Sequence, residues 1–170
     1  PNAAVYWLAR MIEGGEDVKF IARRLLILAS EDIGNANPTA LVIANNTFQA
    51  VSTIGFPESR IILSQCTTYL ACSTKSNASY MAINKAQNLV KETGSLSIPL
   101  EIRNAPTKLM KELGYGDNYK YAHSFDNNFA NQEFMPEDLK GSKLYDPGNN
   151  TRENSQREFL KERWKDKYEY

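Results

Sequence analysis

Four cations and three tyrosine rings lie between residues 103 and 121, and these residue types suit chemistry better than any others in the chain. The cations are Arg103, Lys108, Lys111 and Lys120, and the rings are Tyr115, Tyr119 and Tyr121. Phosphates can meet the charges while bases stack on the rings, as in contacts with single-stranded nucleic acid. A solvated face is the alternative, because Lys108 can pair with Glu112 four residues later and Glu101 lies beside the cations. On that alternative the tyrosine rings pack against other residues of the chain. Both the nucleic-acid contact and the solvated face stay open.

The sequence contains none of the short motifs that would supply an enzymatic site. It has no GxxxxGKS or GxxxxGKT phosphate loop, no GxGxxG turn, no CxxC pair and no HExxH helix. His123 is the only histidine, so no second imidazole is available for a zinc site. It is either a proton donor or phosphate contact, or a structural histidine hydrogen-bonded among aromatic residues, and we favour the structural role. We expect no catalytic residue, no metal and no cofactor in this chain.

Two neighbouring arginines lie in the helix that we expect to be the most buried, because the second half of that helix is apolar on nearly every side. They are Arg23 and Arg24. A buried arginine usually needs a carboxylate partner, and Glu31, Asp32 and Glu58 are the candidates. The alternative is a surface arginine whose aliphatic stem lies along the protein.

Composition narrows the classes of function. The 170 residues suit one domain, or one domain with a small appendage. Because 20 cations balance 20 anions, the chain is no polycation that would attract nucleic acid at long range. Cys66 and Cys72 point to different faces of one expected helix, which predicts reduced thiols in a cytoplasmic protein. No membrane-spanning run or secretory leader is evident, and the start at Pro1 suggests a piece of a longer protein.

The spacing of apolar residues predicts helices throughout residues 1–94. The expected segments run from residue 3 to 12, from 16 to about 31, from 37 to 54, from 57 to about 70 and from 76 to about 94. The third segment, for example, carries Leu41, Ala44, Phe48, Val51 and Ile54 at helical spacing. Five helices with short joints describe an all-α, antiparallel helical bundle.

Beyond residue 94 the pattern changes. A short helix is expected from Pro106 to Leu113, with Asn104 as its cap. Residues 114–150 are rich in aromatic residues among Asn, Asp and Gly, so within residues 95–150 we predict an ordered, irregular extension that lays its rings on the bundle. Residues 151–170 are dense in charge and predict a C-terminal helix or tail that is mostly solvated or packs only in an assembly.

Four stretches, in this order, resemble the C-terminal region of the RarA/MgsA family of AAA+ ATPases, the replication-associated recombination proteins related to the Werner-helicase-interacting protein. They are YWLARMIEGGEDVKFIARRLLILASEDIG at 6–34, TKSNASYMAINKA at 74–86, ETGSLSIPLEIRNAPTKLMKELGYG at 92–116 and FMPEDLKGSKLY at 134–145. The resemblance covers nearly the whole chain. Ser97 and Glu101 depart from it, standing where the family often has proline and histidine, and Glu101 weakens the case for DNA contact through Arg103.

The resemblance implies a domain like the collar of clamp loaders, through which the family forms homotetramers that act at stalled replication forks. It also implies that ATP and Mg²⁺ bind an N-terminal ATPase domain outside these residues, so that this fragment is not itself an enzyme. The expected partners are further copies of the chain, its own ATPase domain, DNA and single-strand-binding protein, with no membrane. The expected location is the cytoplasm, at the nucleoid.

Two other classes of function remain as alternatives. The first is a free-standing helical module, without an ATPase, that binds DNA or another protein. The second is a small helical enzyme, which would need a pocket with converging groups of perturbed pKa. The shortage of histidine and cysteine argues against the enzyme, although carboxylates would still be available for its chemistry.

Overall fold

A computed structural model describes residues 1–170, and it contains helices and no strands. The all-α prediction is therefore confirmed. The chain divides into two compact units. The first unit comprises residues 1–83 and 147–156, and the second comprises residues 84–146 and 157–170. None of the helices combines the length and the apolar character that crossing a lipid bilayer requires.

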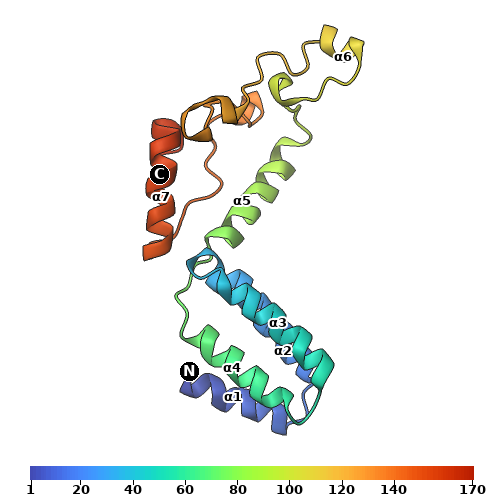
Figure 1. Cartoon of the computed structure of the whole chain (residues 1–170), viewed down its shortest axis with the longest axis vertical. Coiled ribbons are helices and arrows are strands. Elements are labelled where there is room, and N and C mark those ends of the chain that lie inside the picture. Colours follow the sequence, from blue (N-terminus) through green and yellow to red (C-terminus); the bar gives the residue numbers. More distant parts are fainter. The chain divides into compact units, whose positions relative to one another are not determined.

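Four helices build most of the first unit (Figure 1). They are α1 (Asn2–Glu13), α2 (Val18–Leu28), α3 (Thr39–Ile54) and α4 (Ser59–Ala71). Helix α3 packs against both α2 and α4, and α4 also packs against α1. A fifth helix, α5 (Ala78–Thr93), begins in this unit and ends in the second, and none of its residues is fully buried.

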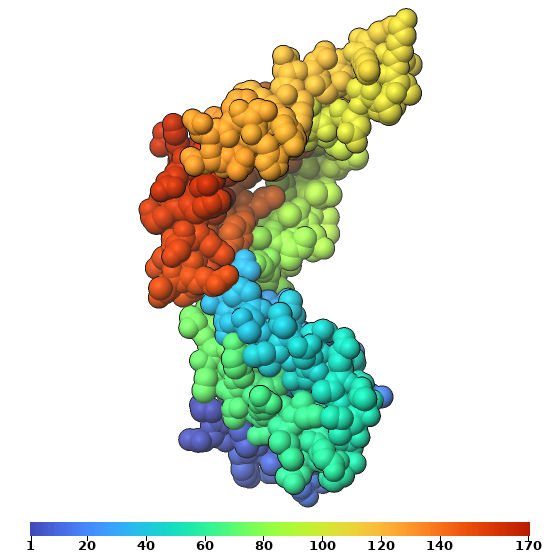
Figure 2. All heavy atoms as spheres, in the orientation of Figure 1, coloured from blue at the N-terminus to red at the C-terminus, as the bar shows by residue number.

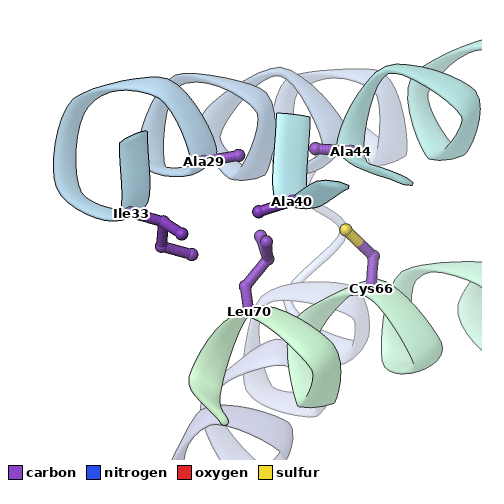
Figure 3. Close-up of a cluster of buried hydrophobic side chains, with 6 residues drawn as sticks. All are labelled: Ala29, Ile33, Ala40, Ala44, Cys66 and Leu70. Carbon is purple, nitrogen blue, oxygen red and sulfur yellow. The ribbon is translucent and has the colours of Figure 1, made fainter. Parts of the chain in front are cut away.

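Small side chains let the helices of the first unit approach closely. One core cluster joins Ala29 and Ile33 to Ala40 and Ala44 of α3 and to Cys66 and Leu70 of α4 (Figure 3). A second cluster contains Leu8, Ile21, Ala22, Val51 and Leu63. Both cysteines are free thiols, as predicted. Burial raises the pKa of the Cys66 thiol, and a hydrogen bond with Thr47 offsets part of that rise.

The connection between α2 and α3 requires a glycine. After Leu28 the chain widens into a π-helical turn (Ala29–Ile33), followed by a 3-10 turn (Gly34–Ala36). Gly34 has φ +49°, and a Cβ atom there would lie 2.8 Å from the carbonyl oxygen of Ser76. The Ser76 N–H donates a hydrogen bond of 2.8 Å to the carbonyl of Asp32. A side chain at position 34 would therefore push apart two segments that hydrogen-bond each other.

The prediction that the apolar second half of this helix is buried on nearly every side is wrong. Leu25 and Leu26 are half-buried and Ile27 is exposed, because the helix packs through one face only. Arg23 and Arg24 are both exposed, and neither forms a salt bridge with a carboxylate. The guanidinium of Arg23 lies over the Phe20 ring instead, 5.2 Å from its centroid. The alternative of a surface arginine is the correct one.

Helices in the second unit are short. Besides the C-terminal part of α5 it holds the 3-10 turn Leu100–Ile102, helix α6 (Lys108–Glu112), four further 3-10 turns and the larger part of α7 (Thr151–Trp164). The short predicted helix exists, but its cap is Thr107 and not Asn104. The Thr107 hydroxyl accepts a hydrogen bond of 3.2 Å from Met110 N–H, because the helix begins two residues after Pro106.

Aromatic rings of the extension gather around the end of α7. Trp164 makes edge contacts with Phe129, at 4.9 Å between ring centroids, and with Phe134, at 6.4 Å. It also contacts Tyr168, at 5.3 Å. The predicted C-terminal segment is thus helical. Trp164 packs against rings of its own chain, so it needs no partner copy to cover it. Packing of the extension on the helical bundle stays a prediction.

Ion pairs join the same segments of the second unit. Asp146 accepts a hydrogen bond of 2.7 Å from Arg157 and pairs with Lys143 at 3.3 Å, while Glu133 pairs with Lys167 at 3.0 Å. Burial alone would raise the pKa of Asp146, but the hydrogen bonds and charges of Arg157 and Lys143 outweigh it and lower that pKa. The pKa of Glu133 is lowered similarly, because backbone N–H groups and Lys167 outweigh its burial.

Candidate functional site

Arg103, the first of the four predicted nucleic-acid contacts, is held by its own unit. Its Nε–H donates a hydrogen bond of 2.7 Å to the carbonyl of Ile98. Its guanidinium lies 4.9 Å from the centroid of the Tyr115 ring, which is a cation–π distance. The same loop is closed by a hydrogen bond from Gly116 N–H to the Leu100 carbonyl. Arg103 and Tyr115 therefore brace this loop.

The three predicted lysines occupy different local environments. Lys108 pairs with Glu112 at 3.7 Å on the exposed face of α6, as the solvated alternative predicted. Lys120 donates from its backbone N–H to Gln132 Oε1 and from its ammonium to the Asn131 carbonyl at 3.1 Å. Lys111 is exposed and forms no salt bridge. The four cations thus share no common partner, and their role in binding nucleic acid stays a prediction.

Two tyrosines of the predicted stretch point to solvent. Tyr119 and Tyr121 are exposed and occupy alternate positions of an irregular segment. The ring of Tyr121 lies 5.2 Å from that of His123, and His123 Nδ1 lies 3.2 Å from Asn128 Oδ1. His123 is exposed, with one ring and one amide beside it, and whether it is structural, a proton donor or a phosphate contact stays a prediction.

An apolar groove that the sequence did not predict crosses the first unit. One hollow of about 590 Å³ is lined by Leu26, Ile27, Ser30, Leu41, Val42 and Asn45. A second hollow of about 360 Å³ is lined by Ile27, Ser30, Glu31, Ser79, Tyr80 and Ile83. Both share Ile27 and Ser30, so they adjoin each other over α2, α3 and the start of α5, and both are shallow and open to solvent. We call the two together the apolar groove.

The groove exists because α3 carries apolar residues on two sides. Ala40, Ala44, Thr47 and Val51 face the core, whereas Leu41 and Val42 are 44% and 59% exposed. Of the expected stripe, Ala44 and Val51 are buried and Phe48 packs against the core, whereas Leu41 and Ile54 are exposed and Ala40 and Thr47 are buried beside them. Figure 2 shows α3, in cyan to turquoise, on the surface of the unit. One sequence signal could have indicated the groove. Ala40 and Ala44 can fill the core face of α3 by themselves, which leaves the neighbouring Leu41 and Val42 to face outward.

The residues that line the groove are suited to binding an apolar surface and include no set of catalytic groups. Its lining contains one charged residue, Glu31, and neither histidine nor cysteine. No group of three or more His, Cys, Asp or Glu side chains is arranged to hold a metal ion. Exposed apolar surface of this kind marks contacts with other macromolecules.

The chain is similar to known proteins over nearly all of its length. The family described as MgsA AAA+ ATPase C terminal matches residues 1–164. Replication-associated recombination protein A of Coxiella burnetii is 47% identical over 150 residues, which are 88% of this chain and 34% of that protein. The Escherichia coli K12 protein of the same name is 43% identical over 150 residues, with the same shares. ATPase WRNIP1 of Dictyostelium discoideum is 41% identical over 147 residues, 85% of this chain and 17% of that protein. The chain spans about a third of the bacterial relatives named here.

Proposed function

This chain belongs to the family of MgsA AAA+ ATPase C-terminal domains, and from that premise we propose that it assembles copies of a replication-associated recombination ATPase. The working form is a homotetramer, in which this domain acts as a collar. ATP and Mg²⁺ bind the ATPase domain of the parent protein, so this fragment catalyses no reaction of its own. The parent acts in the cytoplasm at the nucleoid, on DNA and with single-strand-binding protein.

The apolar groove is the observation that carries this proposal. The side chains of Leu41, Val42 and Ile83 leave much of their apolar surface in water. Covering that surface would lower the free energy of the protein, because burial of apolar area is favourable. A partner surface would remove that exposure, since the cores of stable interfaces are apolar and depleted of charge. The groove lining meets that description, because Glu31 is its one charged residue.

The absolute mass of the chain, measured by light scattering during gel filtration at several concentrations and salt strengths, tests the proposal. We expect a mass of about four chains that survives high salt, because apolar contacts are not screened. Val42→Glu should lower the mass by placing a charge in the groove. Leu109→Glu, at a residue 64% exposed on α6, is the matched control and should leave the mass unchanged. A wild-type monomer at every concentration would contradict the proposal.

Contact with single-stranded DNA is the second candidate function. The exposed rings of Tyr119 and Tyr121 and the unpaired Lys111 support it. Tyr121→Ala should weaken binding of a labelled oligothymidine, because a base–aromatic stack contributes about 1–3 kcal/mol. Lys111→Ala should lower the salt slope by about one for a lost phosphate contact. Lys19→Ala, at an exposed lysine of α2, is the control. Unchanged affinity in Tyr121→Ala, with an unchanged slope in Lys111→Ala, would assign these residues to solvation.

A further inference from the structure

We infer that the outer face of α1 is the surface on which the parent protein docks its own upstream part, the chain that precedes Pro1. Two aromatic side chains, Tyr6 and Trp7, form the centre of this surface, and Arg10 and Met11 lie beside them on the helix. We call these four residues the α1 face. The inference rests on the parent ATPase of the proposed function. It goes beyond the proposed assembly, because the α1 face shares no residue with the apolar groove.

Helix α1 carries apolar residues on two sides, and only one side reaches the core. Leu8 is buried in the second core cluster, and Ile12 packs against that cluster. Tyr6 and Trp7 are 57% and 59% exposed, and Met11 is 41% exposed. Because each residue turns the helix by about 100°, the two rings point at least about 100° away from Leu8. The core of the unit therefore does not account for the aromatic side of α1.

The rings of the α1 face are ordered without a partner. Tyr6 and Trp7 contact each other edge to face, at 5.4 Å between ring centroids and an interplanar angle of 78°. The Arg10 guanidinium lies 5.8 Å from the centroid of the Trp7 ring. A surface that is ordered in advance loses less side-chain entropy on binding. Tryptophan, tyrosine and arginine are also the residue types that contribute most of the binding energy at protein interfaces.

The other tryptophan of the chain illustrates the difference between a covered ring and an uncovered one. Trp164 is half-buried and contacts three rings, those of Phe129, Phe134 and Tyr168. The ring and cation contacts of Trp7 are both with residues of its own helix. No aromatic ring from another segment covers Trp7, so its outer surface is available to a partner.

The relatives indicate which chain lies next to this surface. The matched region makes up 34% of the Coxiella burnetii protein, and the family that contains it is described as C-terminal. A parent of that organisation has most of its chain before Pro1. The Pro1 carbonyl accepts a hydrogen bond of 3.0 Å from Val5 N–H, so the upstream chain joins α1 directly at its first turn. Trp7 lies about 9 Å along the helix from that junction.

This short tether favours the upstream chain over any partner that is free in solution. Five extended residues span about 17 Å, which is enough to return over the Trp7 ring. A segment tethered in this way is present at an effective concentration on the order of millimolar, however dilute the protein is. Arg10 forms no salt bridge within this chain. We therefore expect the upstream part to supply an acidic side chain beside its apolar ones.

Photo-crosslinking in the full parent protein tests the inference. Trp7→p-benzoylphenylalanine places a photoreactive ring at the centre of the α1 face. The irradiated protein is separated on a denaturing gel and its linked peptides are identified by mass spectrometry. We expect a link to a peptide that precedes Pro1, in a product with the mass of one chain. Tyr121→p-benzoylphenylalanine is the matched control, because Tyr121 is also 59% exposed, and it should give no link to that peptide.

Four other results would overturn the inference. A product with the mass of two chains would assign the α1 face to a contact between copies. A link within residues 1–170 would assign it to this domain, and a link to an added oligothymidine would assign it to DNA. The absence of any link at position 7 would show that the face stays uncovered.

Light scattering on the 170-residue chain separates this inference from the assembly proposal. Trp7→Ala should leave the mass of the assembly unchanged, because the α1 face lies outside the groove. A lower mass in a variant that circular dichroism shows to be folded would place the face between copies and overturn the inference alone. A monomeric wild-type chain, together with the expected link in the parent, would remove only the assembly proposal.

Discussion

In the first unit helices of up to 16 residues meet through alanines and aliphatic side chains, whereas in the second short helical turns are joined by aromatic rings and ion pairs. The salt bridges described above all lie in the second unit. The first unit is therefore stabilised mainly by burial of apolar side chains, and the second by contacts between aromatic rings and by ion pairs. Substitutions and acid should therefore affect the two units differently.

The largest effect is expected at Leu63, which is fully buried among Leu8, Ile21 and Val51. Leu63→Ala should lower the free energy of unfolding by roughly 2–5 kcal/mol, through lost burial and the cavity left behind. Urea unfolding followed by circular dichroism measures it. Leu109→Ala on the exposed α6 is the control and should change stability by less than about 0.5 kcal/mol. An equal loss of unfolding free energy in Leu63→Ala and Leu109→Ala would contradict the view that apolar burial stabilises mainly the first unit.

Removing the central ring of the second unit should have a smaller effect. Trp164→Ala deletes the edge contacts with Phe129 and Phe134, and we expect a loss of about 1–3 kcal/mol because the ring is only half-buried. Each unit contains one of the two tryptophans. Fluorescence of a Trp7→Phe chain therefore reports on Trp164 alone. A spectrum typical of a fully hydrated Trp164 in the native chain would contradict its packing.

Acid should weaken the second unit through its carboxylates. The folded-state pKa values of Asp146 and Glu133 lie below their ordinary values of 3.8 and 4.5. Their contribution is therefore complete above those ordinary values and is lost as the pH falls through the lowered ones. We expect less than about 1 kcal/mol from each, since both side chains are partly hydrated. Asp146→Asn should flatten the dependence of stability on pH below pH 4, and an unchanged dependence would contradict the ion-pair assignment.

The smallest effect is expected at the cap of α6. Thr107→Ala removes the hydroxyl that accepts from Met110 N–H and should cost about 0.5 kcal/mol, because the helix is short and exposed. Thr107→Ser keeps the acceptor and should preserve stability. Hydrogen exchange at the amides of residues 108–112 measures the change locally. Equal exchange rates in the alanine and serine variants would show that the hydroxyl does not cap the helix.

Local signals in the sequence predicted much of this architecture. Gly14 and Gly34 follow closely after the expected ends of the first two helical segments, at residues 12 and about 31, and Asp17 caps α2 by accepting from Lys19 N–H. These features act within a few residues, so no knowledge of distant neighbours is needed to interpret them. The cap of α6 was misplaced because Asn104 and Thr107 are both good cap residues. Which of the two residues caps the helix depends on where the chain turns into it, and that turn places Thr107 at the N-terminus of α6.

The candidate site was largely missed. The cations at Arg103, Lys108, Lys111 and Lys120 attracted attention through their residue types, yet Arg103 and Lys120 hydrogen-bond to backbone carbonyls of their own unit. Sequence spacing cannot reveal such partners, because they come from segments up to 11 residues away. The apolar groove was missed because Leu41 had been expected on the apolar stripe of its helix, while Val42 was assigned to no face.

The sequence by itself determined the all-α class, the presence of the main helices and the family, because each of these depends on periodicity, caps and motifs along the chain. Only the tertiary structure decided which apolar stripe of α3 is buried and which lines the groove. Both stripes obey the same helical period, and the choice depends on which neighbouring helices supply complementary surfaces. Ala40 and Ala44 face the core because α2 and α4 approach there, and that leaves Leu41 and Val42 outside.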